Sequence, residues 1–295
     1  MWMEKVLMDL GILDMFTESD NNGWRSTKCC YCSDTSQHLG INVSSGAVKC
    51  WRCGKHYSLE TLHKLSYRSK SEIIEILKRY REDAPRIPKL QKSSYKPLSF
   101  KYSPDLKPID KAFLRQRNFS PRIIQDHYDI RASTHMGGMH HRLIIPVYFN
   151  NQLVAYQGRD VSGKAKMRYL SSDADVVGGI DIKRTLYSYD KASIYDRVLV
   201  VEGPTDVWRL GSGAVSTYGS QFSADQIVLI ARFTTRFIMY DNEPEAQEMA
   251  QILCDELSVF NGHTERITWE DAYKDGGELP DEDSEYIMKE LGFRK

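Results

Sequence analysis

Short apolar runs separated by amphipathic stretches fill the second half of the chain. Residues 198–201 are four consecutive branched or long apolar residues, and residues 214–217 and 236–240 are further strand candidates. Runs of this kind are typical of strands buried on both faces of a parallel sheet. Helical spacing follows residue 205 and covers residues 246–257, so the pattern predicts an α/β domain.

The middle of the chain has a different pattern. Residues 111–128 have helical spacing interrupted by a serine–proline pair, which is typical of one helix ending and a second one beginning. Residues 143–148 and 153–156 predict two strands joined by a hairpin turn at two asparagines. The polar residues 157–160 predict a loop after this hairpin.

Near the amino terminus the predicted elements are short. Residues 3–15 predict a short amphipathic helix, and residues 58–65 and 71–80 predict two more helices. Residues 40–43 and 47–50 predict two short strands around a Ser-Ser-Gly turn.

Four cysteines flank this turn as two C-x-x-C pairs. Cys29 and Cys32 form the first pair, and Cys50 and Cys53 form the second after seventeen intervening residues. Zinc prefers four soft ligands in a tetrahedron, and each short pair can aim two thiolates at one ion. The spacing therefore predicts a zinc ribbon whose closed shell supplies folding energy and leaves no open position for chemistry.

Three neighbouring residues are alternative ligands. Cys30 could replace Cys29, although Cys29 has the spacing of the second pair. His38 and His56 could also substitute, but four cysteines already complete the shell. Because five of the six cysteines lie within residues 29–53, a reducing compartment with a metal site is favoured over a disulfide scaffold.

Aromatic and basic side chains crowd the second cysteine pair. Such a mixture suits single-stranded nucleic acid, because bases stack on rings and phosphates meet cations. Packing of the tryptophan on the small core of the ribbon is an equal alternative. The candidate DNA-binding residues are Trp51, Arg52, Lys55 and His56.

A proline-rich stretch divides the chain. Residues 83–104 contain four prolines among Lys and Ser with little apolar periodicity, which predicts a linker. The predicted segments are an N-terminal helix and zinc ribbon at residues 1–82, the linker at 83–104, a basic part of the larger domain at 105–192, and its parallel-sheet part with the C-terminal segment at 193–295.

The 295 residues carry 40 basic and 40 acidic side chains, so only the distribution of charge is informative. Residues 86–131 hold eleven basic and four acidic residues, whereas residues 241–290 hold sixteen acidic and three basic ones. This asymmetry predicts a surface for a polyanion beside a carboxylate-rich site; two solvated faces of opposite charge are the alternative. No basic flank and apolar run at the amino terminus and no stretch of membrane-spanning length occur, so neither a signal peptide nor a membrane segment is predicted.

Carboxylates stand where the predicted parallel strands end. Glu202 follows the first strand candidate, Asp241 and Glu243 follow the third, and Asp275 lies in a later acidic cluster. Right-handed β-α-β connections bring such ends to one edge of a sheet. Oxygen ligands without His or Cys select Mg²⁺ or Mn²⁺, and two such ions about 4 Å apart can stabilise both oxygens of a phosphoryl displacement. Phosphodiester chemistry is therefore predicted, without a P-loop motor, because no G-x-x-x-x-G-K-[ST] loop occurs.

Taken together and in this order, these motifs resemble the DnaG-type DNA primases of the short kind found in bacteriophages, in which a zinc ribbon precedes a TOPRIM-containing RNA polymerase domain. Each motif alone is weak, but the ordered set is specific and spans about residues 29–278. The matching segments are G-R at 158–159, R-Y-L-S at 168–171, L-Y-S-Y-D-K-A at 186–192, E-G-P-T-D at 202–206, D-N-E at 241–243 and K-D-G-G-E at 274–278.

Three positions depart from the family pattern. Glu243 stands where the family has a second Asp, and its longer side chain can still serve as a metal ligand. Arg168 replaces a Lys, which keeps the charge but presents a planar fork. A second basic residue falls one place off, so that either Lys183 or Arg184 could serve.

The resemblance implies one structural zinc and two catalytic Mg²⁺ or Mn²⁺ ions. Glu202 would bind metal and assist deprotonation of the attacking 3′-hydroxyl, and Asp241 and Glu243 would hold Mg²⁺ with Asp275 nearby. Asp206 would pair with a cation or cap a helix. The residues expected to bind the triphosphate or the template are Arg159, Lys166, Arg168, Lys183, Arg184 and Lys274.

The function implied by the resemblance is synthesis of short RNA primers from ribonucleoside triphosphates on single-stranded DNA during replication. The zinc ribbon would read a short template triplet. A TOPRIM nuclease and a non-catalytic single-strand-binding replication factor are the alternatives. The expected partners are the template, the RNA primer and a separate replicative helicase, in the cytoplasm, which is the host's if the chain is phage-encoded.

Overall fold

The computed structural model describes residues 1–80, 102–133, 138–172, 179–268 and 273–293. Contacts divide the chain into two units, with residues 1–91 and 251–261 in unit 1 and residues 92–250 and 262–295 in unit 2. Most of the predicted linker lies outside the described residues, and the predicted domain boundaries stay predictions. Within the described ranges, no helix has the length and apolar character needed to cross a membrane.

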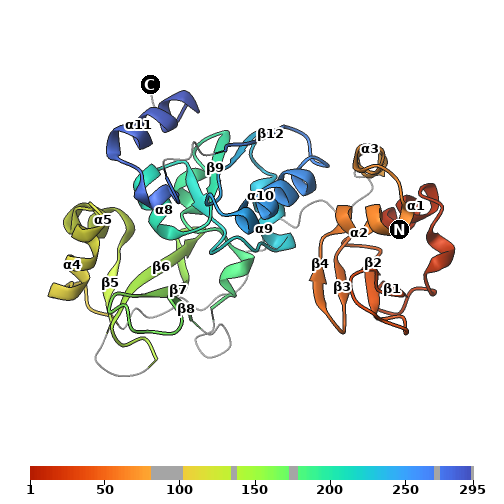
Figure 1. The fold of residues 1–295 in the computed structure, drawn as a ribbon, viewed down its shortest axis with the longest axis horizontal. Helices are drawn as coiled ribbons and strands as arrows, with labels where there is room; N and C mark the ends of the chain where they lie inside the picture. The colour runs from red at the N-terminus through yellow and green to blue at the C-terminus, as the bar shows by residue number, and fades with distance from the viewer. Residues whose placement is uncertain (81–101, 134–137, 173–178, 269–272, 294–295) are drawn as a thin grey trace. The chain divides into compact units, whose positions relative to one another are not determined.

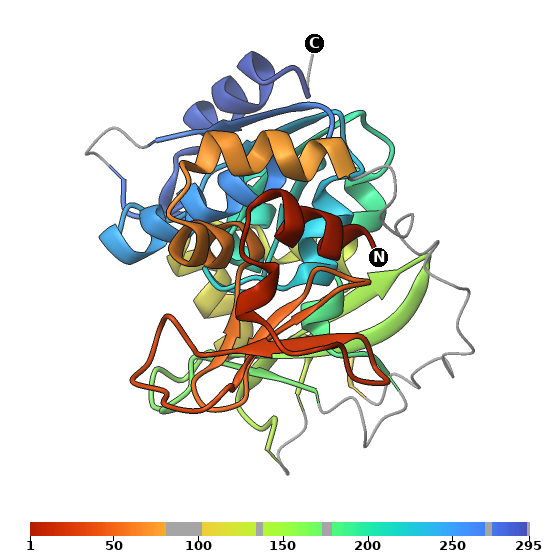
Figure 2. The same ribbon diagram turned by 90° about the vertical axis from the view of Figure 1, so that its right-hand side faces the viewer.

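Unit 1 is built on a four-stranded antiparallel sheet in the order β1-β2-β3-β4. Its helices gather on one side of this sheet (Figures 1 and 2), where Leu39 and Ile41 pack with Leu59 and Leu62 in one fully buried cluster. The elements are α1 (Trp2–Asp9), β1 (Trp24–Thr27), β2 (Leu39–Asn42), β3 (Val48–Cys50), β4 (Gly54–His56), α2 (Ser58–Ser66) and α3 (Lys70–Tyr80).

The helix predicted over residues 3–15 is shorter in the structure. The α-helix ends at Asp9, and a separate 3₁₀ turn covers Leu13–Met15. Between them Gly11 has a φ of 72°, a left-handed conformation that interrupts a right-handed helix and that glycine adopts at little cost.

Unit 2 contains a parallel sheet in the order β10-β9-β11-β12, with β9 at its centre between β10 and β11. The four predicted apolar residues of β9 are all buried, as expected for a strand covered on both faces. The strands are β9 (Arg197–Val201), β10 (Ala214–Ser216), β11 (Thr235–Ile238) and β12 (His263–Arg266). The helices between and after them are α8 (Pro204–Leu210), α9 (Ala224–Ile230), α10 (Pro244–Leu257), whose residues from 251 on belong to unit 1, and α11 (Asp281–Glu290).

An antiparallel sheet in the order β5-β6-β7-β8 completes unit 2, with α4 and α5 beside its edge strand β5 (Figure 1). One hydrophobic cluster contains Leu143 and Ile145 of β6 together with Leu199 and Val201 of β9, so both sheets share a core. The elements are α4 (Pro108–Gln116), α5 (Pro121–Tyr128), β5 (Arg131–Ala132), β6 (Arg142–Phe149), β7 (Gln152–Asp160), β8 (Tyr169–Ser171), two short turns of helix at Ile182–Arg184 (η3) and Gly276–Glu278 (η4), and α7 (Tyr189–Ala192).

The loop predicted at residues 157–160 is wrong, because β7 continues through Asp160. These residues pair with β6, and residues 157–159 pair also with β8. Their backbone groups are thereby satisfied on both edges, which outweighs the polar character of the side chains. The broader prediction, a small β unit joined to an α/β unit with a parallel sheet, is confirmed.

Candidate functional site

The four cysteines of the two C-x-x-C pairs meet in unit 1. Their sulfur atoms all lie within 4.8 Å of one another, and the Sγ atoms of Cys29 and Cys53 are 3.6 Å apart. Cys29 therefore completes the set, and the adjacent Cys30 stays outside it. Four convergent thiols with no other ligand type fit one structural zinc ion.

The candidate DNA-binding residues beside these cysteines differ in exposure. Trp51 is 49% exposed and meets the ring of Trp24 edge-on at 5.4 Å. Arg52 donates to the Ser33 carbonyl, and Lys55 on β4 is exposed. His56 is held more closely, with its ring stacked 3.8 Å from that of Tyr31 and its Nε2 3.1 Å from Cys53 Sγ.

In unit 2 the carboxyl ends of β9 and β11 bring two of the predicted carboxylates together. The strands are parallel neighbours with Val200 opposite Ile238, so the residues that follow them leave the sheet at the same edge. The backbone N–H of Asp241 donates to Glu202 Oε1 at 3.2 Å. The structure thus places Glu202 and Asp241 side by side.

Two further aspartates join them from α8 and η4. Asp206 is 4% exposed and its Oδ2 accepts from the N–H of Gly203 at 2.7 Å, which caps the start of α8. Gly276 and Gly277 pass so close to Asp206 that an added Cβ would lie 3.0–3.2 Å from its side chain. This close approach brings the preceding residue, Asp275, into the same cluster.

Burial and neighbouring charges raise the pKa values of Glu202, Asp206 and Asp241. Burial, followed by the charges of Asp206, Glu202 and Asp275, raises the pKa of Asp241 to about 8. Burial and the charge of Asp275 raise the pKa of Asp206 to about 7, and burial chiefly raises the pKa of Glu202. Carboxylates that raise each other's pKa repel one another unless a proton or a cation lies among them.

Glu243 and Lys274 lie at the exposed rim of this cluster. Lys274 Nζ is 3.0 Å from Glu243 Oε1, and the backbone N–H of Asn242 donates to the Lys274 carbonyl at 2.8 Å. The D-N-E and K-D-G-G-E segments are therefore joined through both backbone and side chains. Lys274 thus neutralises Glu243 at the rim of the cluster.

The chemistry of the donor set fits a divalent cation of the Mg²⁺ type. Asp275 Oδ1 is buried and has no hydrogen-bond partner within the described residues, and the surrounding ligands are hard oxygen atoms. The carboxylate oxygens are spread more widely than the thiols. Among the described residues, the four cysteines form the group whose potential ligand atoms all lie within 4.8 Å of one another.

A group of basic residues, which we call the basic cluster, lies next to the carboxylates. It consists of Arg117, Arg159 and Arg168, of which the first was missed by sequence reasoning. Arg159 is 7% exposed, and burial lowers its pKa with further contributions from the charges of Arg117 and Arg168. The guanidinium groups of Arg117 and Arg159 each lie 5.5 Å from the ring centre of Phe113 on α4. Phe113 and Arg117 are four residues apart on a predicted helix, and this spacing would have indicated that their side chains lie on the same face.

One tyrosine connects the basic cluster to the carboxylates. The guanidinium of Arg159 lies 4.6 Å from the ring centre of Tyr169 on β8. The side chain of Tyr169 also lies beside Thr205 and within reach of the charge of the neighbouring Asp206. Positive and negative groups are thus arranged along one continuous path from β7 to the start of α8.

The remaining predicted phosphate ligands lie in three different settings. Lys183 Nζ donates to the carbonyls of Thr217, Tyr218 and Gln221, so all three of its donors are used. Arg184 pairs with Asp225 at the surface. Lys166 is exposed two residues before Arg168.

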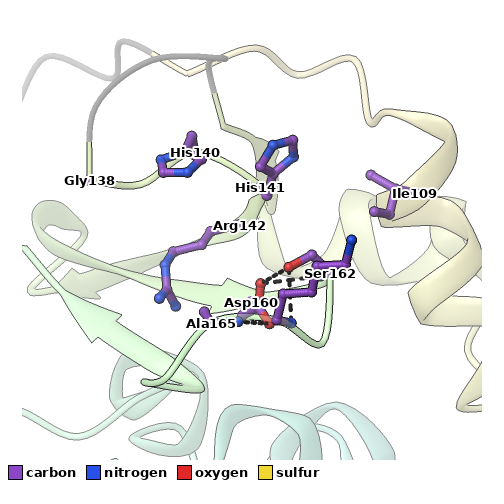
Figure 3. A pocket seen from close by; sticks show the side chains of 9 residues that line it. Ile109, Gly138, His140, His141, Arg142, Asp160, Ser162 and Ala165 are labelled. Carbon is purple, nitrogen blue, oxygen red and sulfur yellow. Dashed lines mark hydrogen bonds between the residues drawn. The ribbon is translucent and has the colours of Figure 1, made fainter.

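A cavity of about 510 Å³ lies elsewhere in unit 2 (Figure 3). It is lined by Arg142 of β6 and Asp160 of β7, by the loop of residues 162–165 that follows β7, and by Ile109 of α4. Two of its charged residues serve the fold: the carboxylate of Asp160 accepts from Ser162 and from the N–H of Ala165, and Arg142 donates to the carbonyls of Gly158 and Met167. Buried carboxyl groups with raised pKa values are typical of functional sites, so the sheet edge at Glu202 is the better candidate site.

Neither a protein-family model nor a curated protein matches the chain. Among solved structures, the zinc-binding and RNA polymerase domains of the Aquifex aeolicus primase are similar, with 14% identity and a TM-score of 0.54 over 97% of this chain and 82% of that one. The DnaG catalytic core has 18% identity and a TM-score of 0.48 over 63% and 71% of the two chains. The Mycobacterium tuberculosis DnaG RNA polymerase domain in complex with double-stranded DNA has 19% identity and a TM-score of 0.45 over 65% and 66%. The first likeness shows a shared fold that includes both units.

Proposed function

We propose that this protein is a DNA primase of the DnaG type, which synthesises short RNA primers on a single-stranded DNA template. The observation that carries the proposal is the path from Arg159 through Tyr169 and Thr205 to the carboxylates at the end of β9 and β11. A polymerase acting on triphosphates needs cations for the phosphates beside carboxylates for divalent metal, and this path supplies both within one unit.

The carboxylates would hold the metal. Glu202, Asp241 and Asp275 converge there, and Glu243 approaches from the rim with Lys274. When bound, Mg²⁺ or Mn²⁺ would lower the pKa of the primer 3′-hydroxyl and neutralise the charge that develops on the triphosphate. Glu202, whose raised pKa reflects burial, is the residue we assign to accept the proton of that hydroxyl.

The arginines would hold the polyanions. Arg159 packs between two aromatic rings, those of Phe113 and Tyr169. This packing fixes the orientation of its guanidinium N–H donors. Arg117 and Arg168 add charge from α4 and from the segment before β8. Together they would position the template backbone or the triphosphate next to the carboxylates, and Lys166 and Arg184 would extend this basic surface.

Unit 1 would bind the single strand near the zinc site. Trp51 presents half of its surface to solvent beside Arg52 and Lys55, which suits base stacking with phosphate contacts. The phage origin, the template triplet and a separate replicative helicase belong to the same proposal and are supported by the sequence resemblance.

The test is incubation of the protein with Mg²⁺, labelled ribonucleotides and single-stranded DNA templates of varied sequence. We expect short template-dependent RNA, which Glu202→Gln should reduce by about a hundred-fold or more, since it removes a carboxylate from the metal and the base. Glu248→Gln, which changes an exposed acid on α10, is the matched control and should retain synthesis. Strand scission instead of synthesis would identify a nuclease, and DNA retention without turnover would identify a binding factor.

A further inference from the structure

A buried arginine outside the motifs connects the two halves of the candidate site. Arg209 stands in the last turn of α8, the helix whose first turn contains Asp206. Its side chain is 3% exposed and its guanidinium lies 4.4 Å from the ring centre of Phe119. Burial of a charged group is costly unless it is paired, so the partners of Arg209 indicate what its position requires.

Those partners lie on two other helices. Nη2 of Arg209 donates to the Arg117 carbonyl at 2.7 Å, and Nη1 forms an ion pair with Asp281, the first residue of α11. Arg117 is the residue at which α4 ends, and Asn118 follows with a left-handed φ of 57°. A carbonyl at a helix end has no partner within its own helix, and an arginine donor is a favourable one.

The arginine that receives this bond belongs to the basic cluster. Because Arg209 holds the backbone of Arg117, it fixes the point from which the Arg117 side chain extends toward Phe113 and Arg159. The same helix, α8, also delivers Asp206 to the carboxylates. Arg209 thus connects, through the rigid helix α8, the end of α4 with the acidic side of the site.

Two further contacts support the docking of this region on α8. The Tyr128 hydroxyl donates to the Val207 carbonyl at 3.0 Å, and Trp208 meets the ring of Phe119 edge-on at 5.9 Å. These contacts would hold α5 against α8 without Arg209. Loss of Arg209 should therefore release the end of α4 locally and leave the fold of unit 2 in place.

We propose that Arg209 is a positioning residue that holds Arg117, and with it the basic cluster, at a fixed distance from the carboxylates, so that a single-stranded DNA backbone bound by the arginines lies in register with the metal site. This inference rests on the proposed function, since it assigns the basic cluster to the template. Misplacement of a binding group by about 1 Å is enough to weaken a reaction that depends on orientation.

The test is a double-mutant cycle on DNA binding without nucleotides, with a fluorescent single-stranded oligodeoxythymidine as the probe. Arg209→Met keeps the volume but loses both partners, and Arg117→Gln removes the cation but keeps the carbonyl. We expect each variant to raise the Kd about five-fold, which corresponds to about 1 kcal/mol. In the Arg117→Gln background, Arg209→Met should have no additional effect, because it acts through Arg117.

Two controls separate positioning from general loss of structure. Asp281→Asn removes only the ion pair, whose acid is 78% exposed, and should leave DNA affinity near that of the wild type. Arg209→Lys keeps a donor for the Arg117 carbonyl and should bind DNA more tightly than Arg209→Met. If Arg209→Met fails to fold, Arg209→Gln, whose shorter side chain cannot reach both partners, takes its place in the cycle. The Tm of each variant reports folding.

Several outcomes would overturn the proposal. Unchanged affinity in Arg209→Met, equal losses in both backgrounds, or unchanged affinity in Arg117→Gln would each do so. The failure of the proposed function looks different: if the cycle shows the expected non-additivity but the wild type makes no RNA, Arg209 still positions a DNA-binding cluster and polymerisation is wrong.

Discussion

Asp206 combines two electrostatic situations that oppose each other. Its Oδ2 accepts the Gly203 N–H, which favours the charged carboxylate, while burial and the charge of Asp275 favour the neutral acid. Burial prevails, and its pKa is raised to about 7. The ionised carboxylate is unfavourable in the metal-free protein, and a nearby divalent cation would stabilise it.

This residue makes the stability of the metal-free protein pH-dependent. Because the folded pKa of about 7 exceeds the ordinary aspartic acid pKa of 3.8, the contribution of Asp206 to stability is fully present below pH 4 and is lost as the pH rises through 7. Asp206→Asn keeps an acceptor for Gly203 and removes the charge. With chelator present, it should be more stable than the wild type at pH 8 by on the order of 2–4 kcal/mol, and equally stable near pH 4. Thermal unfolding at both pH values measures this difference; an equal difference at both would contradict the assignment.

Elements with a strong local pattern were predicted well. The strand β9 was evident from four consecutive apolar residues, and α4 and α5 from the serine–proline pair between them. The carboxylates at Glu202 and Asp241 followed from strand ends. Residues 157–160 were misassigned because their strand character comes from pairing on both sides, a property of the sheet that the segment itself does not encode.

Contacts between distant segments could not be predicted. Arg117 and Arg159 are 42 positions apart in the sequence but lie close together in the structure, and so do Tyr169 and Thr205, which are 36 positions apart. A single sequence records which residues are charged but not which of them the fold brings together. The placement of Lys183 is a similar case, since the basic residue before the L-Y segment was visible but its three carbonyl partners were not.

The turn η4 depends on glycine for its place on α8. A Cβ on Gly276 would lie 3.0 Å from Asp206 Cβ, so Gly276→Ala should displace η4 by a few tenths of an ångström together with Asp275. We expect roughly ten-fold weaker Mn²⁺ binding, the usual effect of disturbing the support of a metal ligand. Titration calorimetry measures it, and an unchanged Tm in chelator is the control. Wild-type Mn²⁺ affinity would show that Asp275 does not contribute to the site.

At the scale of the whole molecule, we expect the two units to have different roles, with unit 1 needed for initiation and unit 2 for nucleotide addition. Cys50→Ser removes one of four convergent thiols, and the apparent binding energy of structural zinc in small domains is about 10–16 kcal/mol, so unit 1 should lose zinc and unfold. The carboxylates and arginines of unit 2 do not depend on that metal. We expect formation of the first dinucleotide to fall much more than extension of a pre-annealed RNA primer.

The measurement compares the two rates in the same protein preparation, with zinc content determined by atomic absorption. Cys254→Ser, which changes a cysteine outside the zinc cluster, is the matched control and should retain zinc. Equal losses of initiation and extension in Cys50→Ser would contradict the division of labour.

The reactivity of Lys183 reports on the motion of the backbone beside Glu202. Burial lowers the pKa of its amine to about 8, so near that pH a large share would be the uncharged form that acylating reagents attack, yet three carbonyls of residues 217–221 enclose it. Acetylation of Lys183 should therefore be slower than that of a fully exposed lysine and should accelerate when this loop opens. Because the Gly219 N–H within the loop donates to the Glu202 carbonyl at 2.8 Å, the labelling rate of one lysine, followed by peptide mass spectrometry, would report how often the backbone beside Glu202 loosens.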